Sequence, residues 1–239
     1  DFAADAVAHP DRVLQRGLIT LGDLRAVGAL AVAIQLAVAL LLDGGLGAVT
    51  LRWLAVAGFS ALMAKEFFVR DWLRKHLVLY AVSHMLVMPL VALWLAAIGG
   101  LTSFDTPVVG AVALLVFCAG LSFEIARKMR APENERPMAD TYTSALGVRR
   151  ASQLLLVVVT ATMLASLATL RELSGELTLV PIRVAVALVS LVAIAVWRFR
   201  ERPTPRNAKI VEASVGVAML VAHVLIVYVV LAARGVALR

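Results

Sequence analysis

Residues 77–98 read LVLYAVSHMLVMPLVALWLAAI, and this stretch decides the fold class because it contains no Asp, Glu, Lys or Arg. A helix needs about 20 mostly apolar residues to cross a bilayer. Outward from this stretch, further segments come close enough in length and apolarity to qualify, at 26–42, 49–64, 107–123, 151–170, 179–197 and 210–233. The sequence therefore predicts an all-α, multi-pass transmembrane helical bundle of about seven helices.

The composition favours a bilayer as the solvent of this chain. Of 239 residues, 62% are hydrophobic and only 16% are charged, and the mean hydropathy is +0.91. These values exclude a water-soluble domain with a polar shell. No linker is long enough to mark a second domain, so we expect one membrane domain over residues 1–239.

The positive charge is concentrated in the connections between apolar segments. A net charge of +7 could indicate nucleic-acid binding, but no basic face runs along a helix, so we expect no nucleic-acid partner. The stretch before the first segment and every second connection are basic, whereas the others are neutral, acidic or mixed. The positive-inside rule places the basic connections in the cytoplasm. The basic residues are Arg12, Arg16 and Arg25; Lys65, Arg70, Arg74 and Lys75; Arg127, Lys128, Arg130, Arg136, Arg149 and Arg150; and Arg198, Arg200, Arg202, Arg206 and Lys209.

Carboxylates gather in two of the basic regions. Asp1 and Asp5 stand four residues apart, so on a helix both would point to one face, where a bound cation would offset their repulsion. The longest polar stretch, residues 124–147, mixes basic side chains with four carboxylates. Carboxylates are ligands for divalent cations, and Arg and Lys bind phosphate oxygens; a solvated loop with internal ion pairs is the simpler alternative. The four carboxylates are Glu124, Glu133, Glu135 and Asp140.

The N-terminal region, DFAADAVAHPDRVLQRG, resembles the first signature of the UbiA-type intramembrane prenyltransferases, which reads roughly N-D-x-x-D-x-x-x-D-x-x-N-x-P-x-R-P-x-x-x-G. Asp1 and Asp5 match its last two aspartates, Pro10 its proline, Arg12 its arginine and Gly17 its glycine. His9 and Val13 depart from it. Further along, Thr141 to Gly147 has the spacing of the stretch that ends the second acidic motif of the family, and the Lys65 region resembles the basic end of the fourth family helix.

The resemblance implies a topology and an activity. Family members have nine transmembrane helices, with the first motif at the end of the second, so we expect this chain to lack the first two helices of a longer protein. The implied reaction is transfer of a polyprenyl group from prenyl diphosphate to a lipophilic acceptor, an aromatic or quinone precursor, within the membrane. Mg²⁺ is the implied cofactor, and it would neutralise the charge that develops on the departing diphosphate. The second motif departs from the family pattern, because glutamates among basic residues replace most of its aspartates.

The implied site residues come from both acidic regions. We expect Asp1, Asp5, Glu133 and Asp140 to act in catalysis, and these four together with Glu124 and Glu135 to bind metal. The residues expected to bind the diphosphate are Arg12, Lys65, Arg70, Arg127, Lys128 and Arg130. For Lys65 and Arg70, contact with lipid headgroups is the equal alternative.

Two alternatives to this function remain open. One is a non-catalytic lipid-binding or transport protein, whose basic connections only set topology and bind headgroups. The other is a family member that has lost catalysis. His84 and His223 lie within predicted spans, where ionisable side chains are functional candidates, but a neutral imidazole donating across helices is the favoured interpretation. The alanine-, valine- and arginine-rich composition indicates a bacterial source, and thus the inner (plasma) membrane, where membrane lipids are further partners.

Overall fold

The computed structural model describes residues 6–7, 10–101, 106–135 and 140–233. Every regular element in this described part is helical. The elements are α2 (Leu21–Asp43), α3 (Ala48–Ala64), η1 (Glu66–Phe68), α4 (Arg70–Arg74), α5 (Leu77–Met85), α6 (Val87–Ile98), α7 (Pro107–Arg127), η2 (Pro132–Asn134), α8 (Tyr142–Ser174), α9 (Leu179–Glu201) and α10 (Pro205–Ala233).

The predicted multi-pass helical bundle is confirmed, since each predicted segment forms one helix or, at 77–98, two consecutive helices. Among the described residues, 6 helices are long and apolar enough to cross a membrane. The seventh predicted segment, Ala48–Ala64, is a shorter apolar helix of 17 residues. Its length is about 25 Å, slightly less than the thickness of a hydrocarbon core.

Several helices extend beyond their predicted apolar cores because capping side chains fix their ends. Thr20 and Asp23 form a reciprocal capping box, so α2 begins at Leu21. The Asp43 carboxylate accepts hydrogen bonds from the backbone N–H groups of Gly47, Val49 and Thr50 at the start of α3. Apolarity marks the part of a helix that lies in lipid, whereas caps mark where it ends.

The apolar stretch that decides the fold is broken in the middle. It forms two helices, α5 and α6, which meet at Leu86. Pro89 has no backbone N–H to donate to the carbonyl of Met85, which explains the interruption at this place. The break lies against α7, where Gly120 leaves room for the side chains of Met85 and Met88.

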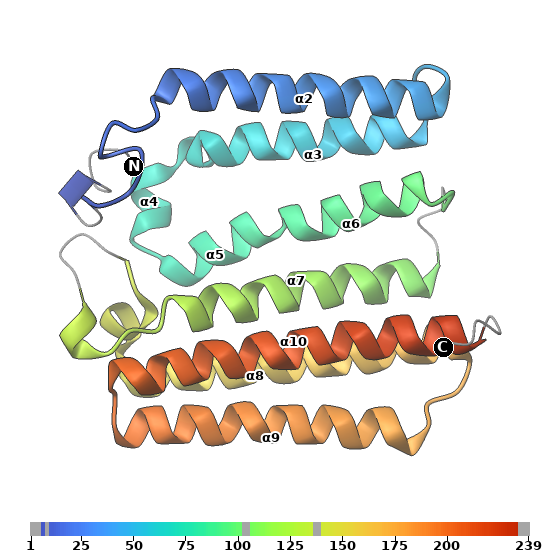
Figure 1. Cartoon of the computed structure of the whole chain (residues 1–239). Helices are drawn as coiled ribbons and strands as arrows, with labels where there is room; N and C mark the ends of the chain where they lie inside the picture. The colour runs from blue at the N-terminus through green and yellow to red at the C-terminus, as the bar shows by residue number, and fades with distance from the viewer. Residues whose placement is uncertain (1–5, 8–9, 102–105, 136–139, 234–239) are drawn as a thin grey trace.

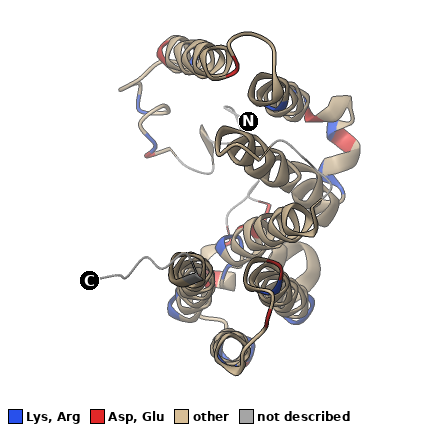
Figure 2. Ribbon diagram, turned by 90° about the vertical axis from the view of Figure 1, so that its right-hand side faces the viewer, with Lys and Arg blue, Asp and Glu red and all other residues tan. Residues whose placement is uncertain are grey.

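Seen along their axes, the helices follow an open arc from α2 at one end to the group α8, α9 and α10 at the other (Figure 2). The larger hydrophobic core joins α5, α7, α8, α9 and α10 around buried side chains such as Leu155, Val192 and Phe199. The smaller core consists of Ala39, Val49, Trp53 and Ala97, from α2, α3 and α6. Many large apolar side chains point outward, which suits contact with lipid acyl chains.

Successive long helices run in opposite directions, so the connections fall at two ends of the bundle (Figure 1). One end, on the left of Figure 1, carries η1, α4, η2 and the α9–α10 connection. The other end carries the α2–α3, α6–α7 and α8–α9 connections. The alternation of charge along the sequence thus becomes a separation of charge between the two ends.

Candidate functional site

Nearly all the described basic side chains lie at the end of the bundle that carries η1 and η2, which we call the basic end. Among the described residues, the only Lys and Arg located elsewhere are Arg52, Arg171 and Arg183. Arg52 is buried, and its guanidinium donates to the carbonyls of Leu93 and Leu101 at the opposite end, which is a structural role. An anionic group would therefore bind most favourably at the basic end.

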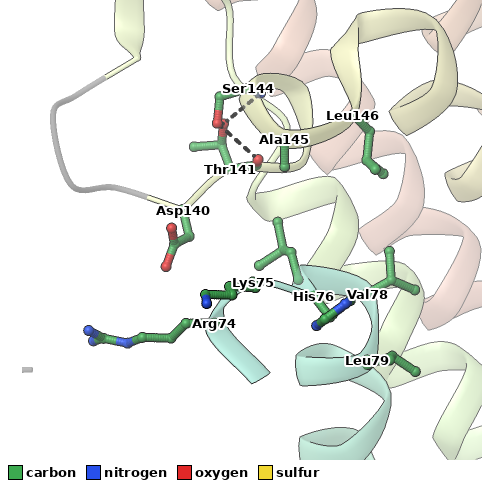
Figure 3. A pocket seen from close by; sticks show the side chains of 11 residues that line it. Arg74, Lys75, His76, Val78, Leu79, Asp140, Thr141, Ser144, Ala145 and Leu146 are labelled. Atoms are coloured by element: carbon green, nitrogen blue, oxygen red, sulfur yellow. Dashed lines mark hydrogen bonds between the residues drawn. The ribbon is translucent and has the colours of Figure 1, made fainter. Parts of the chain in front are cut away.

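A pocket of about 340 Å³ opens at the basic end, between the start of α5 and the start of α8. Asp140 lies on one side of its mouth, and Arg74 and Lys75 lie on the other (Figure 3). The pocket therefore carries charges of both signs at its mouth. Its wall consists of His76, Leu77, Val78, Leu79, Thr141, Ser144, Ala145 and Leu146.

The wall formed by α8 is fixed by a hydrogen-bond network around its first turn. Thr141 is the N-cap, and its hydroxyl accepts from the backbone N–H of Ser144 at 3.1 Å. The Glu135 carboxylate lies 2.7 Å from the Thr141 hydroxyl and 2.8 Å from that of Thr143. Thr143 in turn accepts from the backbone N–H of Arg130 at 2.9 Å. These contacts tie the connection after α7 to the start of α8 and hold Asp140 at the pocket mouth.

The four carboxylates predicted in the second acidic region have different surroundings. Glu124 lies in the last turn of α7, where Arg127 approaches to 2.6 Å and Lys128 to 2.8 Å. Glu135 is engaged by threonine hydroxyls. Glu133, in η2, and Asp140 are exposed. Glu124 and Glu135 thus already have partners, and Glu133 and Asp140 are more accessible to a ligand.

The other predicted site residues are only partly brought together. Asp1 and Asp5 lie outside the described residues, so the first acidic motif has no described geometry. Lys65 and Arg70 flank η1 and are exposed, and Arg12 is exposed in the segment before α2. Within the described ranges, no group of three or more His, Cys, Asp or Glu side chains is arranged to hold a metal ion.

A second cluster of polar side chains lies between α3, α5 and the end of α7. After α3 the backbone adopts positive φ angles at three successive non-glycine residues, Glu66 (50°), Phe67 (52°) and Phe68 (63°). This conformation costs L-residues about 1–2 kcal/mol each. Such strain persists only where surrounding contacts enforce it, and it is frequent at functional sites.

The strained turn presents Glu66 to two side chains of α5. The Tyr80 hydroxyl donates to Glu66 Oε1 at 3.3 Å, and His84 Nε2 lies 3.5 Å from Glu66 Oε2. The side chains of His84 and Glu66 are only 14% and 17% exposed. The Tyr80 and His84 rings stack with their centroids 4.0 Å apart, and Phe67 meets His84 edge-on.

Sequence reasoning identified only part of this cluster. His84 is a candidate from sequence because it is ionisable within an apolar stretch. Glu66 is not, because it lies in a connection whose other charged residues are mostly basic. The interpretation of His84 and His223 as neutral imidazoles that donate across helices is wrong, since each Nδ1 contacts a carbonyl of its own helix. The contact of His223 is with Met219 at 2.7 Å and that of His84 is with Tyr80 at 2.8 Å. His84 differs from His223 in that it also faces a carboxylate from another element.

Comparisons of the chain with family models, with curated proteins and with solved structures found no match.

Proposed function

We propose that the chain is a Mg²⁺-assisted prenyltransferase, which transfers a polyprenyl group from its diphosphate to a lipophilic acceptor, an aromatic or quinone precursor, in the membrane. The observation that carries this proposal is the pocket at the basic end, where Asp140 lies opposite Arg74 and Lys75. A carboxylate and cations around one pocket suit a diphosphate with its metal ion. The motif-like spacing of Asp1, Asp5 and Arg12 supports the same reaction.

In this proposal Mg²⁺ binds the carboxylates that have no protein partner in the described ion pairs and hydrogen bonds of the second acidic region. Glu133 and Asp140 would hold the ion together with Asp1 and Asp5, because hard cations prefer carboxylate oxygens. Glu124, although it is within the predicted metal set, is neutralised by Arg127 and Lys128. When bound, Mg²⁺ would offset the negative charge that grows on the diphosphate as its bond to the prenyl carbon breaks.

The remaining basic residues have a supporting role in this proposal. Lys75 and Arg74 reach the pocket directly and add to the predicted set of Arg12, Lys65, Arg70, Arg127, Lys128 and Arg130. Their charges would bind phosphate oxygens and draw the anionic substrate to this end. Since a volume of about 340 Å³ is at the small end for ligand pockets, it suits the headgroup, while the prenyl chain lies along the apolar helices.

The proposal includes an orientation in the membrane. The basic end would face the cytoplasm by the positive-inside rule, so the diphosphate would enter from the aqueous compartment in which charged metabolites are made. The bacterial inner membrane is the proposed location. Six membrane-length helices support integral insertion.

Binding of a prenyl diphosphate tests the proposal without knowledge of the acceptor. The full-length protein in lipid nanodiscs would be titrated with geranylgeranyl thiolodiphosphate, a non-hydrolysable analogue, with and without Mg²⁺. We expect Mg²⁺-dependent binding that weakens at least about tenfold in Asp140→Asn and in Asp5→Asn, because each loses a charged ligand. Glu176→Gln, at the opposite end, is the matched control and should bind as the wild type does.

The same titration separates the alternatives. Binding that ignores Mg²⁺ and the Asp140→Asn change, but weakens as anionic lipid is added, would support a lipid-binding protein whose basic end recognises headgroups. No binding of the analogue would remove prenyl diphosphate as a ligand. Binding of the analogue in a protein that transfers the prenyl group to no acceptor would support a prenyltransferase-like protein that has lost catalysis.

A further inference from the structure

The proposed function gives no role to the cluster of Glu66, Tyr80 and His84, although the backbone that positions Glu66 is strained. The three positive φ angles of residues 66–68 aim the Glu66 carboxylate at α5, away from the solvent that surrounds its exposed neighbours. The carboxylate is mostly buried, and Oε2 has no hydrogen-bond partner. A buried carboxylate oxygen without a donor is costly unless a proton or a cation joins it.

The hydrogen bond at the other ring nitrogen of His84 determines what Glu66 faces. Nδ1 lies 2.8 Å from the carbonyl oxygen of Tyr80. A carbonyl only accepts, so Nδ1 carries a hydrogen, and in the neutral ring Nε2 is then a bare acceptor. Nε2 and Glu66 Oε2 thus face each other as two acceptors at 3.5 Å. One proton placed between them converts this repulsion into a charge-assisted hydrogen bond.

The groups around this gap connect it with the residues expected to bind the diphosphate. The Tyr80 hydroxyl donates to Glu66 Oε1, and the centroid of the Tyr80 ring lies 6.0 Å from the Lys128 ammonium group. Lys128 directly follows α7 and forms an ion pair with Glu124 in the last turn of that helix. Lys128 is one of the residues expected to bind the diphosphate, so Tyr80 links the gap to that set of residues.

We propose that the gap between His84 Nε2 and Glu66 Oε2 receives the proton that the acceptor loses during prenyl transfer, an inference that rests on the proposed function. In that step the nucleophilic carbon or oxygen of the acceptor forms a bond to C1 of the prenyl group. The bond from C1 to the diphosphate oxygen breaks, and its electron pair leaves with the diphosphate. The hydrogen of the nucleophile moves as a proton to His84 Nε2, where Glu66 stabilises the imidazolium, and no oxidant or reductant is needed.

His223 provides a matched control for the proton site, because its Nδ1 makes the same contact with a carbonyl four residues earlier. No carboxylate of the described residues forms an ion pair with it. In full-length protein with ¹⁵N-labelled histidine, in nanodiscs, the ring-nitrogen chemical shifts report which of Nδ1 and Nε2 carries a hydrogen in His84 and in His223. Glu66→Gln should change the His84 Nε2 shift, because an amide replaces the carboxylate that faces it, and should leave the His223 shifts unchanged. An unaltered His84 Nε2 shift in Glu66→Gln overturns the proposal.

Transfer kinetics give the functional half of the test, with radiolabelled geranylgeranyl diphosphate as donor and a lipophilic phenol, 4-butylphenol, as acceptor probe. Glu66→Gln and His84→Gln should each slow transfer at least about a hundredfold, the range of a lost general base. The loss should shrink as the pH rises and the phenol ionises, and His223→Gln should behave as wild type. Unfolding midpoints show whether each variant is folded. If only one of the two variants folds, that variant alone still tests the proton role.

Failure of the proton role and failure of the proposed function would give different results. If the variants transfer as fast as wild type, the proton role is overturned while prenyl transfer stands. If the wild type does not bind geranylgeranyl thiolodiphosphate, the proposed function fails first. Because neither Glu66 nor His84 is assigned to the diphosphate, binding of the analogue should be within about twofold of wild type in both variants, well below the tenfold change that a lost charged contact produces.

Discussion

Gly147 is the residue at which the first turns of α8 separate from the rest of the helix. Its φ of 76° and ψ of 157° are non-helical, yet the chain continues as helix on both sides. The turn before it carries Thr141, Ser144 and Leu146, which line the pocket. The pocket wall is therefore set by a backbone conformation that favours glycine.

Replacement of Gly147 by alanine should destabilise the protein by about 1–3 kcal/mol, because this combination of φ and ψ is adopted almost only by glycine. No atom would collide with that Cβ, so the backbone alone accounts for the effect. Gly28, inside α2, also has open space around it, and Gly28→Ala should stabilise by about 0.5–1 kcal/mol. Unfolding in mixed micelles measures both changes. Equal effects at the two positions would contradict the conformational explanation.

For single residues, the sequence predicts which side chains lie at the membrane surface better than it predicts which side chains contact each other. Asp140 was among the predicted site residues and lines the pocket, whereas Arg74 and Lys75 were predicted only as basic residues of a connection at one membrane surface. Glu66 could not, since three positive φ angles in a stretch without glycine follow no sequence rule. The pairing of Glu135 with Thr141 and Thr143 could not be foreseen either, as a short-range bond of this kind depends on the loop conformation.

The pair α7 and α8 is the element-scale unit that positions the pocket. Ser122 and Thr162, both buried, lie 3.0 Å apart across the two helices. Since the Thr162 hydroxyl donates to the carbonyl of Val158, Ser122 is the donor between the helices. Hydrogen bonds of this kind between transmembrane helices contribute modestly to stability.

A double-mutant cycle with Ser122→Ala and Thr162→Val should give a coupling energy of about 0.6 kcal/mol in the free energy of unfolding. Thr169 is a suitable comparison, because its buried hydroxyl donates only to the carbonyl of Ala165 on its own helix. Ser122→Ala and Thr169→Val should therefore be additive. A coupling indistinguishable between the two cycles would show that the Ser122–Thr162 contact adds nothing.

Helix existence was predictable at the element scale, and helix ends were not. Uninterrupted apolarity identifies the buried length of each span, but α7 continues to Arg127 and α8 begins at Tyr142, both inside the stretch predicted as a polar connection. Charged side chains at helix ends still reach water, so charge alone does not end a helix. Caps such as Thr141 are visible in the sequence, but many threonines cap nothing.

For the whole molecule, the separation of basic and non-basic connections predicts how the chain lies in a bilayer. In a Cys118→Ser background, single cysteines at Lys75, Glu176 or Arg202 would be exposed to label. In sealed inverted vesicles, a membrane-impermeant maleimide should modify the Lys75→Cys and Arg202→Cys variants but not Glu176→Cys, because the first two lie at the basic end. Labelling of all three from one side, in vesicles shown to be sealed, would refute the alternating topology.

The interruption at Leu86 has a mechanical consequence for the molecule. A continuous helix transmits a push along its length, whereas one with a missing hydrogen bond yields at that place. α6 packs against α3 and contributes to the smaller core, whereas α5 packs against α7 and lines the pocket with its first turn. A bend at Leu86 would therefore move the half that carries the pocket wall and leave the half in the smaller core in place.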